Sequence, residues 1–275
     1  MTDAAHSSPA PRPAPGPDQP PIPVRLVTFN THHGVGTDER HDLARLATVL
    51  AAAEADLVCL QEVDRHFGPR SEGVDQALLL SRALDMQLAW GPAIDEPGRD
   101  GGERRQYGNA LLSRLPVLVS DVHRLPGSGE PRSALQTMLE LDGGTLWVTA
   151  THLTTTSAAE RAEQVAALAA LHTDSMATGV LVGDFNAAPG APELEPLLGR
   201  FTDAWERAAQ KEDRAGWRFW HSGQGRTHPA GSPRRRIDQV WVTPGVEVVS
   251  ARVLDAEGAS DHLPLVVDLL VPSGV

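Results

Sequence analysis

The sequence predicts an α/β protein: a four-layer α/β/β/α sandwich in which two mostly antiparallel sheets pack face to face between outer helices. Three observations support this prediction. Strand-like and helix-like segments alternate from Val24 onward. Several strand-like segments then follow one another at the short spacing that is typical of antiparallel hairpins. The same order recurs, compressed, in the second half, where LVGDFN resembles LVTFN.

The first half is expected to contain two strand–helix units followed by hairpins. Residues 24–30 and 56–63 are apolar runs and are predicted as strands. Residues 38–53 are predicted as a helix because apolar residues recur at i, i+3, i+4 and i+7, and residues 75–84 as a second helix. Further strands are predicted at 107–114, 117–125, 133–141 and 145–153.

The second half is expected to repeat this order. Ser157 and Glu160 form the S-x-x-E pattern of a capping box, which predicts a helix that runs to about His172. The apolar run GVLVGDF at 179–185 is the next predicted strand, and residues 201–233 are expected to be rich in loops. The last predicted strands are 235–242, 246–254 and 262–270.

The chain is expected to form a Pro/Ala-rich, disordered tail at 1–23 and a single catalytic domain at 24–275. The tail lacks the basic and apolar regions of a secretory signal. No stretch approaches 18 apolar residues, so we expect no membrane span. The single cysteine, Cys59, lies in an apolar run and suits a reducing compartment, so we expect a cytoplasmic monomer.

The formal net charge of −12 argues against a general nucleic-acid binder. The argument is weak, since a small basic patch can lie on an acidic body. Arginine pairs and triplets at 104–105 and 234–236 form such local patches.

Polar groups stand at six predicted strand ends or adjacent turns. They occur in FNTHH (29–33), LQEVD (60–64), ATHL (150–153), GDFN (183–186), RRIDQV (235–240) and SDHLP (260–264). Because side chains alternate along a strand, Asp184 and Asn186 are expected to share one face.

Each of these residues has an ordinary structural explanation when it is taken alone. Glu62 could be a surface carboxylate, Asn30 a turn residue, and His152 a hydrogen-bonded core histidine. A buried Asp238 would need a partner. Taken together, the carboxylates, carboxamides and histidines favour a site for a hard cation and for phosphoryl transfer, in which a His–Asp couple can take a proton from water.

The motifs TFN, QEVD, YGNALLSR, THL, GDFN, RRIDQVWV and SDHLPL occur in this order. The series resembles that of the endonuclease/exonuclease/phosphatase superfamily, which includes deoxyribonucleases, abasic-site endonucleases, inositol-polyphosphate phosphatases and neutral sphingomyelinases. The resemblance covers Arg25 to about Leu270 and is most similar to the small bacterial hydrolase branch that grades into sphingomyelinase-like enzymes.

The resemblance implies a metal site and a substrate side. Asn30, Glu62 and Asp261 would hold Mg²⁺ (or Mn²⁺). Substrate would be bound by Tyr107, Asn109, Arg132 and Arg236. For the two arginines the alternatives are a solvated loop side chain and a partner for nearby carboxylates.

The resemblance also implies catalytic roles. His262, paired with Asp238, would be the general base, or a ligand and charge stabiliser. Asp184 and Asn186 would orient the water and the phosphate, although some family mechanisms make Asp184 the base. His152 would contact phosphate or protonate the leaving group. The loop histidines 32, 33, 221 and 228 are interpreted as surface residues that lie near the rim.

The sequence therefore predicts a metal-dependent hydrolase, a phosphodiesterase or phosphatase, of a small or lipid head-group phosphoester. A metal-dependent endo- or exonuclease on DNA or RNA is the first alternative, and a non-catalytic binding module is the second. A serine hydrolase is disfavoured, because the adjacent residues Ser260, Asp261 and His262 cannot form a triad.

Overall fold

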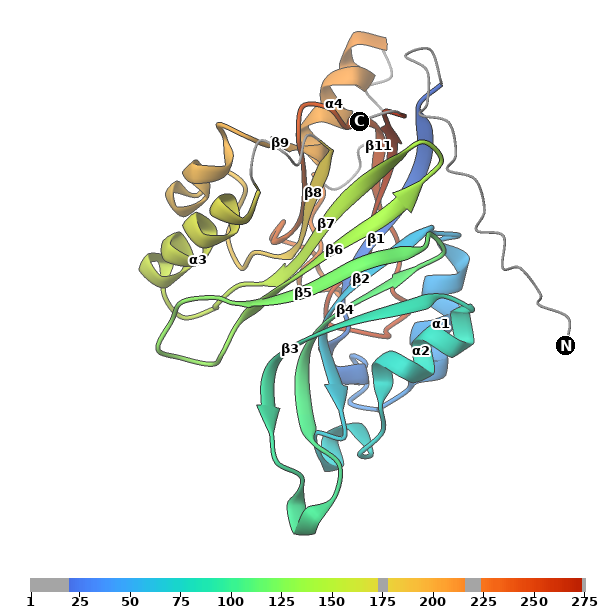
Figure 1. The fold of residues 1–275 in the computed structure, drawn as a ribbon, viewed down its shortest axis with the longest axis vertical. Coiled ribbons are helices and arrows are strands. Elements are labelled where there is room, and N and C mark those ends of the chain that lie inside the picture. Colours follow the sequence, from blue (N-terminus) through green and yellow to red (C-terminus); the bar gives the residue numbers. More distant parts are fainter. Residues whose placement is uncertain (1–19, 173–177, 216–223, 274–275) are drawn as a thin grey trace, which may run out of the picture.

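Two six-stranded sheets pack face to face and carry helices on their outer sides (Figure 1). The structure is a computed structural model, and it describes residues 20–172, 178–215 and 224–273. The four-layer sandwich that the sequence predicts is confirmed.

The first sheet gathers the two ends of the described chain. Its strands are β1 (Ile22–Asn30), β2 (Leu57–Arg65), β3 (Gln87–Glu96), β4 (Arg105–Ser113), β11 (Glu247–Val253) and β12 (Leu265–Val271). Their order across the sheet is β11–β12–β1–β2–β4–β3. Only β1 and β2 pair in parallel within this sheet.

The second sheet is built from the middle of the chain. Its strands are β5 (Val117–Arg124), β6 (Ser133–Leu141), β7 (Gly144–His152), β8 (Gly179–Asp184), β9 (Thr202–Asp203) and β10 (Asp238–Val242). Their order is β5–β6–β7–β8–β10–β9, and only β7 and β8 are parallel.

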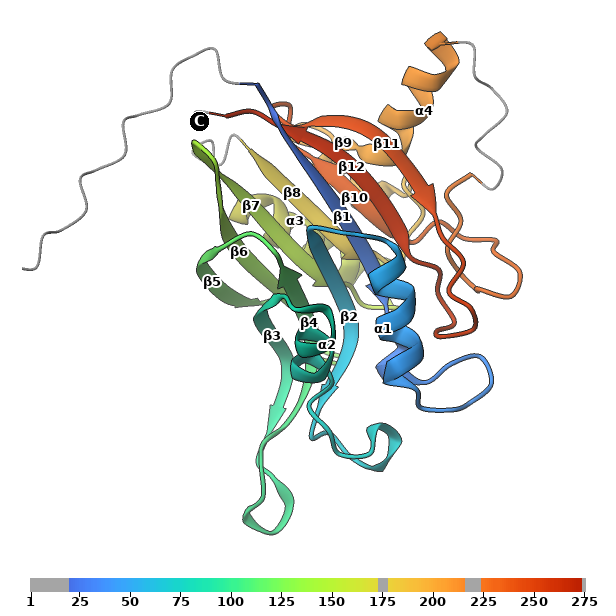
Figure 2. The same ribbon diagram turned by 90° about the vertical axis from the view of Figure 1, so that its right-hand side faces the viewer.

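Helices connect the parallel pairs and cover the outer faces. They are α1 (Leu43–Ala52), α2 (Gln76–Leu84), α3 (Ala158–Leu171) and α4 (Ala204–Ala215), with the short 3-10 helices η1 (His32–Gly34), η2 (Pro69–Ser71), η3 (Arg99–Gly101) and η4 (Pro192–Leu197). Figure 2 shows α1 and α2 over the first sheet and α3 behind the second. Ser157 caps α3 by accepting from the Glu160 amide, as the capping box predicts.

Three apolar clusters make the four layers. The central cluster lies between the sheets and includes Leu26, Leu135 and Val182. Phe29 packs with α1 and α2 on the outer face of the first sheet, and Phe185 packs with α3 and η4 on the second. Each such buried side chain contributes about 1.5–3 kcal/mol by leaving water, so the strand ends rest on a rigid support.

Three elements differ from the sequence prediction. The segment expected to be loop-rich contains β9 and α4, and β3 was not predicted. The α4 sequence AWERAAQKEDRA is so polar that it lacks an apolar repeat over most of its length. Strand β3 contains Gly91 and Pro92, which normally interrupt strands. It is tolerated as an edge strand whose register shifts between Pro92 and Ile94.

The predicted tail falls mostly outside the described residues, which begin at Pro20. Strand β1 starts at Ile22, where Ile22 and Pro23 pair with Val271 and Leu270, two residues earlier than expected. No helix in the described ranges is long and apolar enough to cross a membrane.

Candidate active site

The polar strand ends meet at one edge of the sandwich. His152, Asp184 and Asp238 are lateral neighbours across β7, β8 and β10 of the second sheet. Asn30, at the end of β1 in the first sheet, reaches across and donates from Nδ2 to Asp184 Oδ2 at 3.1 Å. The same Nδ2 lies 3.0 Å from Glu62 Oε1. The Asn30 amide therefore joins carboxylates that belong to different sheets.

Backbone irregularities direct two of these side chains. The register of β2 shifts between Leu60 and Val63, and Glu62 within this bulge has a φ of 57°. Asn186 has a φ of 49° and follows Gly183, whose φ is 144°. A Cβ at Gly183 would lie 1.9 Å from the Thr151 carbonyl oxygen, so only glycine allows β7 and β8 to approach this closely.

Asp184 lies at the centre of the cluster and is only 1 % exposed. Its Oδ1 accepts from the Asn186 backbone amide at 2.9 Å. Its Oδ2 lies 3.7 Å from His152 Nε2 and 3.8 Å from His262 Nε2. Burial, with repulsion from Asp238, raises the pKa of Asp184 well above its usual range. One carboxylate oxygen thus faces two imidazoles and one carboxamide.

His262 and Asp238 form the expected couple in space. His262 Nδ1 lies 2.8 Å from Asp238 Oδ2, which also accepts from the Thr227 hydroxyl. Burial lowers the pKa of His262, but the charges of Asp238, Asp184 and Asp261 outweigh it and raise the pKa to about 10. His262 therefore carries a proton on both ring nitrogens at neutral pH, in the protein without a bound cation.

His152 is held as a neutral imidazole between two hydrogen-bond donors. Its Nδ1 lies 3.2 Å from Arg132 Nη1, and its Nε2 lies 3.1 Å from Asn186 Nδ2. Arg132 Nη1 and Asn186 Nδ2 can both only donate, so each ring nitrogen faces a donor and these two contacts do not select one tautomer. Burial and the charge of Arg132 lower the pKa of His152 to about 3. Nε2 lies between the Asn186 amide nitrogen and Asp184 Oδ2, which is 3.7 Å away.

Glu62 and Asp261, both predicted as metal ligands, lie in different surroundings. Burial raises the pKa of Glu62, but hydrogen bonds from His33 and Asn30 help to outweigh it and hold the pKa below its usual range. Asp261 lies between His32 Nδ1 at 4.0 Å and His228 Nε2 at 3.7 Å. Both carboxylates therefore stand beside imidazoles that the sequence did not assign to the site.

Within the described ranges, two groups bring three ligand atoms within 4.8 Å of one another: His228, Asp261 and His262, and Asp184, Asp238 and His262. Asp261, a predicted ligand, belongs to the first group, and Glu62 belongs to neither. His262 belongs to both groups because its Nε2 faces the centre while Nδ1 is held by Asp238.

The loop histidines were expected to be surface residues, and three of them line this cluster. His33 Nδ1 is 3.8 Å from Glu62 Oε2, and the rings of His228 and His262 are 4.5 Å apart. The pair HH follows TFN after one intervening residue, Thr31, a signal that could have identified His32 and His33. No comparable signal marks His228, and His221 lies outside the described residues.

Three of the predicted substrate-binding residues lie on the β4–β6 side of the cluster. Arg132 is 7 % exposed and bonds to His152, so it is not a solvated loop arginine. Tyr107 is also buried, and burial together with the charge of Glu62 raises its pKa. Asn109 donates to the Ser133 carbonyl, and its buried Oδ1 has no hydrogen-bond partner among the described residues.

Arg236 differs from the prediction in its position. Its Nη1 lies 2.8–2.9 Å from both carboxylate oxygens of Asp203, and its Nη2 lies 2.8 Å from Glu206. The side chain is thereby directed away from Asp184. Arg236 therefore pairs with nearby carboxylates, which was the alternative to substrate binding in the sequence prediction.

The fold and the cluster define a class of protein: a two-sheet hydrolase sandwich with a carboxylate–imidazole centre at its strand ends. The model of the Endonuclease/Exonuclease/phosphatase family matches residues 27–262, and the chain belongs to this family. Its members act as hydrolases on phosphoesters. No curated protein sequence matches this chain significantly.

Solved structures with the same fold support the assignment. An endonuclease/exonuclease/phosphatase from Beutenbergia cavernae is 29 % identical with a TM-score of 0.70, covering 92 % of this chain and 72 % of its own. The human Nocturnin catalytic domain with bound sulfate is 23 % identical with a TM-score of 0.64, covering 90 % and 94 %. A Bacteroides thetaiotaomicron mannosyl-6-phosphatase is 16 % identical with a TM-score of 0.67, covering 90 % and 99 %. The last two likenesses show the fold alone.

Proposed function

We propose that the protein is a divalent-metal-dependent hydrolase of a small or head-group phosphoester. The observation that carries the proposal is the position of Asp184. Its Oδ2 is within 3.8 Å of two imidazole nitrogens and 3.1 Å from the Asn30 amide. A phosphate beside this carboxylate would meet donors on two sides, and a water beside it would meet a proton acceptor.

The donor set fits a divalent cation. Asp184 and Asp238 approach each other deep in the protein, where two negative charges repel, and a cation beside these carboxylates would relieve that repulsion. Glu62, charged and fixed by Asn30, is the other candidate ligand. Oxygen ligands with few imidazoles suit Mg²⁺ or Mn²⁺. When bound, the cation would polarise a phosphoryl oxygen and neutralise charge that develops in the transition state.

The geometry assigns different tasks to the two histidines. Neutral His152, with Arg132 at Nδ1, would donate from Nε2–H to a phosphate oxygen that takes the place of the Asn186 amide at that nitrogen. Protonated His262, oriented by Asp238, would stabilise negative charge. Asp184, whose pKa is raised toward neutrality, is then the better candidate to accept the proton of an attacking water.

The deciding experiment is a metal-dependent activity screen. EDTA-stripped protein is tested with bis(p-nitrophenyl) phosphate, p-nitrophenyl phosphate, phospholipid head-group esters and supercoiled plasmid, before and after Mg²⁺ or Mn²⁺ is added. We expect turnover of a small ester only with metal, and Asp184→Asn serves as the inactive control. Full activity in the stripped protein would refute metal dependence. Rapid plasmid nicking at low nanomolar protein, lost in His152→Ala, would favour a nuclease instead.

A further inference from the structure

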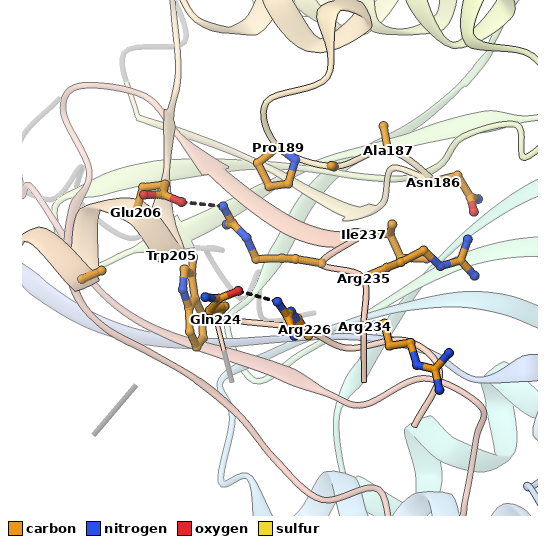
Figure 3. Close-up of a pocket in the computed structure, with 13 residues that line it drawn as sticks. Asn186, Ala187, Pro189, Trp205, Glu206, Gln224, Arg226, Arg234, Arg235 and Ile237 are labelled. Atoms are coloured by element: carbon orange, nitrogen blue, oxygen red, sulfur yellow. Dashed lines mark hydrogen bonds and ion pairs between the residues drawn. The ribbon is translucent and has the colours of Figure 1, made fainter. Parts of the chain in front are cut away.

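A cavity of about 640 Å³ opens beside Asn186. Four arginines line it, with Trp205, Pro189 and Ile237 supplying apolar surface; the arginines are Arg226, Arg234, Arg235 and Arg236. In Figure 3, Asn186 stands at one end of the cavity and Trp205 and Glu206 at the other. The cavity volume lies within the range of about 300–1,000 Å³ that is usual for small-molecule sites.

Three of the four arginines have no ion-pair partner among the residues that the structure describes. Arg236 is neutralised by Asp203 and Glu206. In the described part of the chain, no carboxylate forms an ion pair with Arg226, Arg234 or Arg235, and all three are exposed. The partners of two of them are neutral: Arg226 donates to Gln224 Oε1 at 2.6 Å, and Arg235 donates to His228 Nδ1 at 2.7 Å.

The cavity adjoins the reactive centre at Asn186 and Arg235. Asn186 lines it, and Asn186 Nδ2 lies 3.1 Å from His152 Nε2. Arg235 contacts His228, whose ring is 4.5 Å from that of His262. Figure 3 shows the Arg235 guanidinium on the side of the cavity nearest Asn186. A substrate whose phosphate lies beside Asp184 would extend into the cavity.

We propose that this cavity is a subsite for a second phosphate group, so that the substrate is a small organic bisphosphate; this inference rests on the proposed function. Guanidinium groups bind phosphate through paired hydrogen bonds. Pro189, Ile237 and the indole of Trp205 would face the carbon skeleton between the two phosphates. A duplex or a long single strand would need cations along a track, whereas these arginines gather around one cavity in a chain of net charge −12.

The test measures binding without turnover. Alkane-α,ω-bisphosphonates with two to six carbons and the matched alkylphosphonates resist hydrolysis, because each phosphorus is attached to carbon. Their affinities are measured calorimetrically with Mg²⁺ present, for the wild type, for Arg234→Gln/Arg235→Gln and for Arg226→Gln. Arg82→Gln, at an exposed position of α2 on the outer side of the first sheet, is the matched charge control.

We expect at least one bisphosphonate to bind about tenfold or more tightly than its monophosphonate, because the second phosphonate gains charged hydrogen bonds from the arginines. The double variant and Arg226→Gln should each reduce this ratio, and Arg82→Gln should keep it. Equal binding of both ligand types by the wild type, or an unchanged ratio in both pocket variants, would overturn the subsite. Tighter binding of a thymidine decanucleotide that depends on the same arginines would overturn the small-molecule assignment. Absence of turnover on every phosphoester would refute the proposed function without changing these affinities.

Discussion

Replacing Asp238 with asparagine should abolish a pH dependence of folding that the His262–Asp238 couple creates. The pKa of His262 is about 10 in the folded protein and 6.5 as its ordinary value. Because the folded pKa is raised, the stability that His262 contributes is fully present below pH 6.5 and is lost as the pH rises toward 10.

The magnitude follows from that window. Between pH 7 and 9 the histidine holds a proton in the folded state and lacks it in the unfolded state. A difference of one bound proton between the folded and unfolded states lowers the free energy of unfolding by roughly 1.4 kcal/mol for each rise of one pH unit. His262 alone therefore lowers the free energy of unfolding by about 3 kcal/mol over the two units. In Asp238→Asn the pKa of His262 should fall by several units, since burial then opposes a proton that has lost its nearest charge.

The assay is urea unfolding of EDTA-stripped wild type and Asp238→Asn at pH 7, 8 and 9, with the His262 ring followed by NMR. Taking the difference between the two proteins removes the contribution of every group whose titration the substitution leaves unchanged. The free energy of unfolding of the wild type should fall more steeply than that of the variant, by about 3 kcal/mol over the range. Parallel slopes, or an NMR pKa near 6.5 for wild-type His262, would refute the reasoning.

The remaining predictions concern the metal, the pH response of a second histidine, and the N-terminus. Glu62→Gln should weaken Mn²⁺ binding in calorimetry, whereas His262→Ala should mainly lower kcat, by about 10²–10⁴; small and equal effects would place both residues outside the site. The pKa of His152 is lowered to about 3, so its contribution to stability is present above pH 6.5 and lost as the pH falls. The free energy of unfolding of His152→Asn should therefore fall less between pH 6 and 4 than that of the wild type. Identical slopes of this free energy against pH would contradict the lowered pKa of His152. Deleting residues 1–23 should lower Tm more than deleting 1–19, because only the former removes a paired part of β1; equal values of Tm would show that this pairing adds nothing.

The parts of the fold that could be predicted are those in which local sequence and tertiary packing agree. The runs that became β1, β2 and β8 are buried on both faces, and such strands appear as continuous apolar stretches. The α3 start could be predicted because Ser157 and Glu160 carry the capping signal themselves.

The elements that were missed depend on neighbours that are remote in sequence. Strand β3 forms despite Pro92 because it is the edge partner of β4. Helix α4 is predominantly polar, and it is held by Asp203, which accepts from the backbone amides of Trp205 and Glu206.

The same distinction applies to the site. Residues at strand ends could be selected because alternation and strand termination are visible along the chain. The contacts among these residues could not be predicted, since Asp261 approaches His228 and His262 through loops and not through a strand register. The direction of Arg236 depends on Asp203, at the end of a two-residue strand, and no local pattern indicates that strand.

The Asn30 amide donates to Glu62, which belongs to the first sheet, and to Asp184, which belongs to the second. The reactive centre therefore lies at the interface between the two sheets. Neither sheet holds a complete set of groups, so the centre exists only while the sheets keep their relative position. Sliding of one sheet over the other would separate these groups before any strand unpaired. The rate of turnover should therefore depend on how the two sheets pack against each other. A substitution in the core between them, such as Leu135→Ala, should slow turnover without altering any residue that touches substrate.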